Sequence, residues 1–282
     1  MTLSLTLSLV FGTSVKRAAL RTSAAPAAPR AARAGAFTLL EMLLCIVVVA
    51  LLVALALPAV GRARARADEA VALANLRSSH GVLAAYGNDH RESFPDFLNP
   101  KVEINFVRLA DGRVVQIDRY FFASWFWYLP LVDFAYDGVL RPRSIYPGET
   151  LRRFGPGGPS FYMPCVFFAH ADFWTPETRT GPEQWGGTRW PDVQFPAQKF
   201  LLTSYFNFHF EELTPHGERG SETRVPFVAV DGAARVARAG RIRPGMISGD
   251  GWFPPGSLHT FEWHPGQHTL GGVRGRDIDT LR

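Results

Sequence analysis

The sequence predicts an α+β fold in which one long N-terminal helix packs on an antiparallel β-sheet domain. Residues 37–60 form an apolar run with a single charged side chain, and residues 61–90 place leucines at helical spacing. Residues 91–282 alternate short aromatic or branched runs with glycine and proline turns, which is typical of hairpins. We therefore expect a leader at 1–36, a transmembrane half-helix at 37–60, an extracytoplasmic half-helix at 61–90 and a β-rich domain at 91–282.

The leader is strongly basic and accounts for the whole net charge of the chain. The formal net charge is +5, and residues 1–36 contain no acid and five basic residues, Lys16, Arg17, Arg21, Arg30 and Arg33. The remainder therefore has no net charge. A nucleic-acid-binding face would need the positive surplus on the folded domain, so nucleic acid is excluded as an expected partner. The Ala/Pro/Arg-rich leader itself has no pattern that builds a core.

The apolar run is long enough to cross a membrane. As a helix, residues 37–60 would measure about 36 Å, more than the hydrocarbon core of a bilayer. Its one charge, Glu41, lies near the start, where an isolated carboxylate costs at least about 2.5 kcal/mol. Membrane lipid is therefore an expected partner, and Glu41 is expected to need a partner of its own.

The junction between leader and apolar run carries a family resemblance. Residues 35–42, GAFTLLEM, resemble the class III prepilin signal of type IV pilin-like proteins and pseudopilins. The resemblance implies that a prepilin peptidase cleaves between Ala36 and Phe37, with Gly35 and Ala36 as the small residues before the cut, and N-methylates Phe37. It further implies that Glu41 neutralises the terminal amine of an adjacent subunit.

The spacing within the apolar run agrees with cleavage at that bond. Counting from Phe37 places Glu41 at position five and Pro58 at position twenty-two, where pilins carry a helix-kinking proline. The commonest pattern has glycine directly before the cut, whereas here Ala36 occupies that place. The resemblance also implies other pilin or pseudopilin subunits and an inner-membrane assembly platform as partners. It places the chain in the bacterial inner membrane with its N-terminus cytoplasmic and its C-terminal domain outside.

An ordinary secretory signal peptide is the alternative interpretation of this segment, with Ala54-Leu55-Ala56 as its exit. A signal core usually has 7–15 apolar residues, and an acid inside it serves no purpose. The run here is longer and contains Glu41. Flanking charge does not decide the orientation, because arginines lie on both sides, at Arg21, Arg30 and Arg33 before the run and at Arg62, Arg64 and Arg66 after it.

The membrane helix is expected to continue as an amphipathic helix to about Gly87. Its apolar positions recur at three and seven residues, at Leu73, Leu76, Leu83 and Tyr86. Gly87-Asn88 is a suitable stop, because both residues tolerate the left-handed conformation that ends helices. His80 falls on the leucine side and is interpreted as a packed or hydrogen-bonded histidine.

The β-rich domain is expected to contain hairpins closed by Asp111-Gly112 and Asp231-Gly232, dipeptides that type I′ turns prefer. Residues 86–95 resemble the passage with which pseudopilin-like proteins leave the helix. A further resemblance, to a subfamily with a C-terminal His-then-Asp-Gly element, is carried by Ser124-Trp125 with Leu129-Pro130, by residues 203–207 and by residues 227–232. In this chain His216 stands 15 residues before Asp231, whereas the subfamily's spacer is nine.

Several side chains are candidates for a metal site. A zinc site would use His259, Glu262, His264 and His268, but Pro265-Gly266 interrupts any helix that could pair them. Calcium, which some pseudopilins hold, would find oxygens at residues 248–251 or 277–279, and neither stretch alone supplies the six to eight oxygens that calcium takes. We therefore expect no cofactor, with calcium as an alternative. Cys45 and Cys165 are expected to be unpaired thiols.

The aromatic run at 120–128, YFFASWFWY, is interpreted as a core strand covered on both faces, with a carbohydrate platform as the alternative. No nucleophile elbow, Walker loop, dinucleotide fingerprint or zincin helix occurs in the sequence. The expected function is a non-catalytic subunit of a type II secretion or type IV pilus-like filament. The rivals are a membrane-tethered binding domain for a carbohydrate or surface polymer, and a tethered metallohydrolase built on the C-terminal histidines.

Overall fold

The computed structural model describes residues 38–140, 142, 145, 161–204, 206–207, 212–215, 224–246 and 266–279. The chain divides into two units, Met1–Ala54 (the N-terminal unit) and Leu55–Arg282 (the C-terminal unit). The fold is α+β, with one long apolar helix and antiparallel strands, as the sequence predicts.

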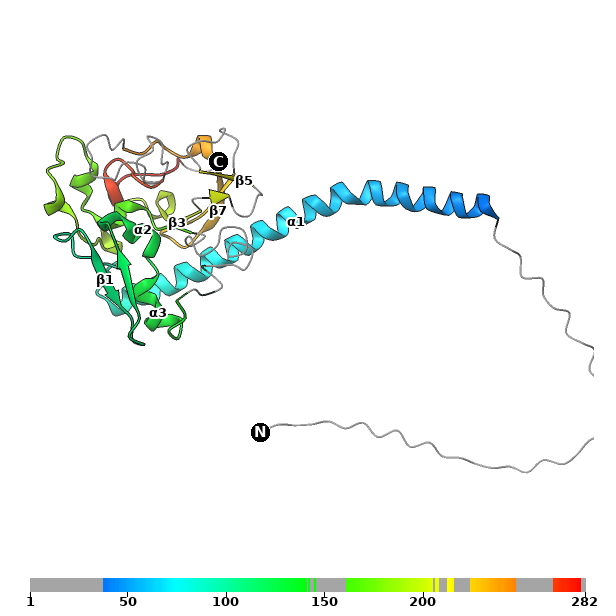
Figure 1. Ribbon diagram of the computed structural model, residues 1–282. Coiled ribbons are helices and arrows are strands. Elements are labelled where there is room, and N and C mark those ends of the chain that lie inside the picture. The colour runs from blue at the N-terminus through cyan, green and yellow to red at the C-terminus, as the bar shows by residue number, and fades with distance from the viewer. Residues whose placement is uncertain are drawn as a thin grey trace, which may run out of the picture. The chain divides into compact units, whose positions relative to one another are not determined.

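Helix α1 (Leu39–Asp89) is the longest described element and runs from blue to cyan in Figure 1. It ends two residues beyond the expected stop at Gly87. Two short helices, α2 (Ala123–Phe126) and α3 (Leu129–Ala135), lie further along the chain. Single 3₁₀ turns make up much of the rest: η1 (Tyr120–Phe122), η2 (Cys165–Phe168), η3 (Ala171–Trp174), η4 (Pro182–Gln184), η5 (Trp190–Asp192), η6 (Pro196–Gln198), η8 (Ala239–Arg241) and η9 (Gly272–Arg274).

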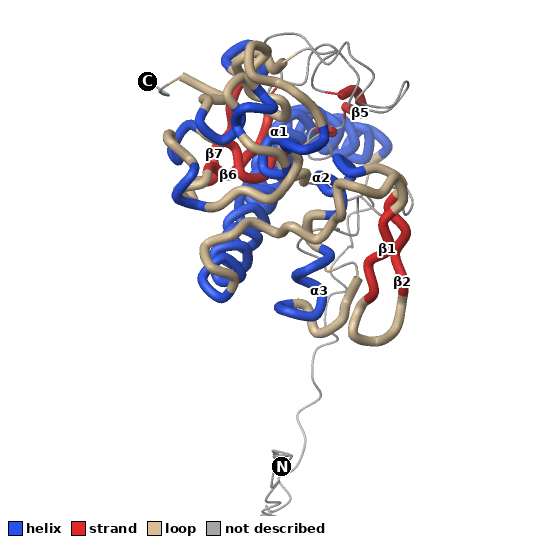
Figure 2. The backbone as a smooth tube through the Cα atoms, turned by 90° about the vertical axis from the view of Figure 1, so that its left-hand side faces the viewer, coloured by secondary structure: helices blue, strands red, loops and turns tan. Residues whose placement is uncertain are grey.

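The described strands form three small antiparallel sheets. Strands β1 (Asn105–Arg108) and β2 (Val114–Ile117) make a hairpin that stands apart from β6 and β7 in Figure 2. Strands β3 (Phe200–Thr203), β6 (Arg224–Ala229) and β7 (Ala234–Arg238) make a three-stranded sheet in the order β3-β6-β7. Strands β4 (Phe206–Asn207) and β5 (Glu212–Pro215) form the third pair.

Both faces of the β3-β6-β7 sheet are buried. Along β6, Val225 and Phe227 belong to a small cluster that includes Ile278 from the C-terminal segment, whereas Val228 belongs to the main core. This alternation follows from the two-residue period of a strand. Because apolar cover lies on both sides, the strand is almost continuously apolar in sequence rather than alternating with polar residues.

The second half of α1 supplies one wall of the main core. Ala72, Leu76 and Leu83 have 0–1% of their surface exposed and lie on one stripe of the helix. His80 lies beside this stripe, where its Nε2 donates to the Val230 carbonyl at 3.1 Å, so its interpretation as a hydrogen-bonded histidine is confirmed. A salt bridge of 2.8 Å between Glu69 and Arg224 ties the same helix to β6.

The two Asp-Gly hairpins are confirmed, but their predicted turn type is wrong. Gly112 and Gly232 both have φ +87, whereas neither Asp111 nor Asp231 has the positive φ that a type I′ turn requires at its first central residue. In each hairpin the glycine N–H donates to a carbonyl three residues earlier, at 3.0 and 2.9 Å. Each aspartate accepts the N–H two residues on at 2.9 Å. Both loops are therefore three-residue loops with a left-handed glycine.

The aromatic run at 120–128 is core, but it is not the predicted strand. It forms η1 and α2, and its buried aromatic residues are Tyr120, Phe121, Trp127 and Tyr128. Phe122, Trp125 and Phe126 are half-buried, so the run does not form an open platform. Cys165 is also buried in the main core, and no disulfide joins it to Cys45.

Candidate membrane-insertion and assembly segment

The first half of α1 presents apolar side chains on all sides. From Leu39 to Leu57 the large hydrophobic residues are exposed, with Leu39 at 91%. In a soluble protein such a surface would be a large unburied apolar patch. Among the described residues, α1 is the one helix long and apolar enough to cross a membrane. The chain therefore contains a single candidate membrane span in its described part.

Glu41 helps to cap the N-terminus of α1. Its Oε2 accepts the Thr38 backbone N–H at 2.9 Å and the Thr38 hydroxyl at 3.0 Å, and its own N–H donates to the Thr38 Oγ1 at 3.2 Å. This reciprocal pattern is a capping box, which satisfies two backbone donors that a helix N-terminus leaves without partners. The Thr-x-x-Glu spacing of Thr38 and Glu41 is its sequence signature. The capping box does not neutralise the carboxylate charge.

Pro58 lies inside α1, and the helix continues through it to Asp89. A proline has no backbone N–H, so the carbonyl of Ala54 loses its usual helical partner at this point. The other residues of the expected processing site, Gly35, Ala36 and Phe37, lie outside the described residues. Cleavage at Ala36–Phe37 and methylation of Phe37 stay predictions.

The histidines proposed for zinc are not brought together in the described part of the chain. His268 is 1% exposed and stacks on Trp174, with ring centroids 5.4 Å apart. His259, Glu262 and His264 lie outside the described residues. Over the ranges that the structure describes, no group of three or more His, Cys, Asp or Glu side chains is arranged to hold a metal.

The two aspartates considered for calcium are each engaged by a cation. Asp279 accepts the Arg243 Nε–H at 3.0 Å, and Asp277 lies 3.3 Å from the Lys199 ammonium. The other calcium candidate, residues 248–251, lies outside the described residues. Residues 277–279 therefore serve ion pairs that tie the C-terminal segment to the domain.

The Lys199–Asp277 pair is a buried polar centre that sequence reasoning missed. Both side chains have no solvent exposure. Besides Lys199, the carboxylate accepts the Phe200 N–H at 2.7 Å and the Thr269 hydroxyl. Burial raises the pKa of Asp277 and lowers the pKa of Lys199, and the attraction between the two charges opposes both shifts. The partners stand 78 residues apart, and no local motif signals them.

Comparisons with known proteins give no relative for this chain: no family model, no curated protein and no solved structure matches it.

Proposed function

We propose that the chain is a non-catalytic, pilin-like subunit that is inserted in the bacterial inner membrane and assembled into a type II secretion or type IV pilus-like filament. The observation that carries the proposal is the isolated carboxylate of Glu41 at the first turn of an exposed apolar helix. A charge at that depth is expensive in lipid, and a positive partner offsets the cost.

Cleavage before Phe37 would supply such a partner. The new α-amine would lie one residue before Thr38, which already donates its N–H to Glu41. Within one subunit, the capping box holds the carboxylate beside the helix start. In a filament, the amine of an adjacent subunit would pair with the same carboxylate, as the resemblance of residues 35–42 implies. The prepilin peptidase, sister subunits and the assembly platform are the partners in this proposal.

The test separates the charge of Glu41 from its capping role. Glu41→Gln removes the charge, but its amide oxygen still accepts the Thr38 N–H, whereas Thr38→Ala removes the capping hydroxyl and keeps the charge. We expect Glu41→Gln to be processed and membrane-bound but absent from the sheared filament fraction. Thr38→Ala should still be incorporated. N-terminal mass spectrometry of each purified protein reports cleavage and methylation at Phe37.

Two results would contradict the proposal. A mature N-terminus away from Phe37 would remove the processing step. If the Glu41→Gln protein is processed and membrane-bound and supports the same cellular function as the wild type, that result would instead favour a membrane-tethered binding domain that uses the signal only for export and anchoring.

A further inference from the structure

Three arginines follow directly on the apolar run of α1. They are Arg62, Arg64 and Arg66, and the first stands two residues after Val60, the last exposed large hydrophobic residue of that run. Their Cα atoms span about 6 Å along the helix axis, which matches the thickness of about 5–7 Å of the headgroup region on each side of a bilayer. When residues 37–60 cross the membrane, all three side chains therefore lie at the depth of the lipid headgroups.

The three arginines point to opposite sides of the helix. At 3.6 residues per turn, Arg62 and Arg66 lie on one side of α1 and Arg64 lies on the other. All three are exposed, and none forms an ion pair among the residues that the structure describes. A lipid surface surrounds a helix, whereas a protein docks on one side of it, so this arrangement fits lipid better than a protein partner.

The nearby carboxylates do not cancel the positive charge. Residues 61–87 contain two acids, Asp68 and Glu69. Glu69 already forms an ion pair of 2.8 Å with Arg224 from β6. The three arginines at the end of the apolar run therefore keep a surplus of positive charge, and a partner for them must be anionic.

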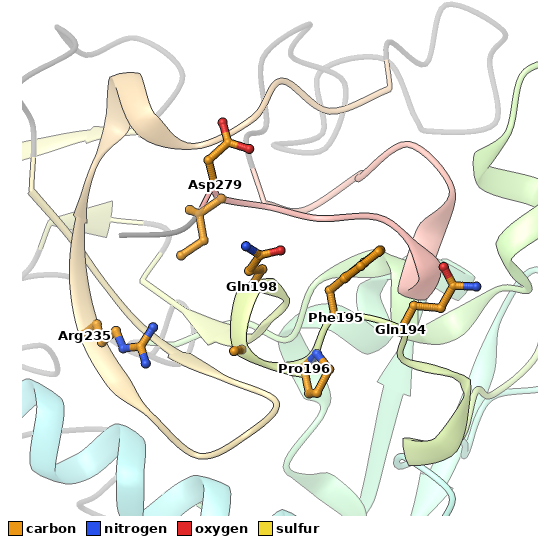
Figure 3. Close-up of a pocket in the computed structure, with 8 residues that line it drawn as sticks. Gln194, Phe195, Pro196, Gln198, Arg235 and Asp279 are labelled. Carbon is orange, nitrogen blue, oxygen red and sulfur yellow. The ribbon is translucent and has the colours of Figure 1, made fainter. Parts of the chain in front are cut away.

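The basic surface continues from α1 onto one face of the β3-β6-β7 sheet. Arg224 and Arg238 are exposed and stand directly opposite each other in the register of β6 and β7. Because side chains alternate along a strand, they lie on the face of Ala234, which belongs to the main core together with α1. Arg235 has the opposite orientation and lines a cavity of about 600 Å³ (Figure 3). Glu69, which Arg224 reaches, is only about 5–10 Å along the helix axis from the three arginines, close to the distance of about 8 Å over which salt screens a charge.

We propose that Arg62, Arg64 and Arg66 bind the phosphates of anionic phospholipids in the leaflet from which the domain emerges. Arg224 and Arg238 add attraction at longer range. Bound phosphates fix the depth of α1 in the bilayer and keep the basic face of the domain near the membrane surface. The inference rests on the membrane insertion in the proposed function, but not on cleavage or filament assembly.

Electron paramagnetic resonance of spin-labelled lipids tests the proposal on the purified full chain in phosphatidylcholine vesicles. The measured quantity is the association of spin-labelled phosphatidylglycerol with the protein, relative to that of spin-labelled phosphatidylcholine. We expect a ratio of at least about five, and a smaller ratio at about 1 M salt, which screens the charges. A protein that enters the vesicles but gives a ratio near one overturns this inference alone. A protein that does not enter the vesicles overturns it together with the membrane insertion in the proposed function.

A triple variant locates the lipid site on the chain. Arg62→Gln/Arg64→Gln/Arg66→Gln should lower the ratio by at least about threefold. The helix should persist, because glutamine and arginine have similar helix propensities. The basic leader is the same in both proteins, so the difference in the ratio reports these three positions. An unchanged ratio overturns the assignment, and an unchanged ratio with loss of incorporation into filaments would mean that the arginines meet carboxylates of a sister subunit instead.

A matched control removes the same charge from another part of the domain. Arg91→Gln/Arg108→Gln/Arg119→Gln changes three exposed arginines, one beyond the end of α1 and two in or next to the β1-β2 hairpin. Arg91 lies about 40 Å along the helix axis from the start of the basic cluster, well beyond the screening distance. The control variant should change the ratio by less than about 1.5-fold. Equal losses in the two triple variants would show a response to net charge alone and overturn the assignment.

Discussion

At the residue scale, the Lys199–Asp277 pair illustrates how a buried charge is tolerated. Taking two ions out of water costs several kcal/mol each, and this cost is offset only when hydrogen bonds satisfy the remaining polar groups. Asp277 meets that condition through the Phe200 N–H and the Thr269 hydroxyl. Removal of either charged partner would leave the other ion in an apolar interior.

We predict that Asp277→Ala lowers the free energy of unfolding by about 3–5 kcal/mol, because it leaves a buried lysine unpaired. Urea denaturation measures the change. The double variant Lys199→Met/Asp277→Leu should recover most of the loss. Asp279→Asn, which weakens an exposed ion pair with Arg243, should cost less than about 1 kcal/mol. A loss below 1 kcal/mol for Asp277→Ala would contradict this account.

Cys165 gives the pH dependence at the same scale. Burial raises the pKa of the Cys165 thiol to about 12 from its ordinary value of 9.0. Because the folded pKa is raised, its contribution to stability is complete below pH 9 and is lost as the pH rises toward 12. At pH 10 the loss should be about 1 kcal/mol relative to Cys165→Ala. Denaturation curves of both proteins at pH 8 and pH 10 test this difference, and parallel behaviour would contradict it.

At the scale of elements, the two hairpins provide a matched pair of turns. Gly112 and Gly232 have the same φ of +87, but a Cβ at Gly112 would meet nothing within 4 Å, whereas one at Gly232 would lie 2.9 Å from the His80 ring. Thus one turn is open to solvent and the other is packed against α1.

We predict that Gly112→Ala costs about 1–2 kcal/mol through left-handed strain alone. Gly232→Ala should cost about 2–4 kcal/mol, because the His80 ring must also move from the Val230 carbonyl. Thermal unfolding of the two variants measures the difference. Equal losses of stability in the two variants would show that the close contact with His80 does not affect the free energy of unfolding.

Elements in which apolar residues recur at a regular spacing were predictable from sequence. Elements in which other apolar residues conceal that spacing were not. The α1 stripe and both hairpins follow from local patterns. In the aromatic run, the buried positions 120, 121, 123, 124, 127 and 128 recur as they would on one face of a helix. Because the half-buried positions are also aromatic, a binary apolar pattern conceals that period. The Lys199–Asp277 pair joins segments distant in sequence, and only tertiary structure brings them together.

At the scale of the whole molecule, α1 is part of the folded domain as well as a candidate membrane span. Its second half contributes Ala72, Leu76 and Leu83 to the main core. We predict that a fragment of residues 61–282 folds, and that a fragment of residues 91–282 does not. Without Leu76 and Leu83, the apolar surface that they bury is exposed to water, which costs roughly 3–6 kcal/mol. That cost is a large part of an ordinary domain's stability. Circular dichroism melting tests both, and a cooperative transition in the shorter fragment would contradict the prediction.

The separation of Lys199 and Asp277 along the chain also imposes a delay on folding during synthesis. Lys199 leaves the ribosome 78 residues before Asp277, a delay of about 4–16 s at ordinary rates of synthesis. Throughout that interval Lys199 lacks its ion-pair partner Asp277, and strand β3 lacks the C-terminal segment that packs against it. The β3 segment therefore reaches its final packing only after Asp277 has been synthesised, and we expect a chaperone that shields β3 during those seconds to raise the yield of folded protein.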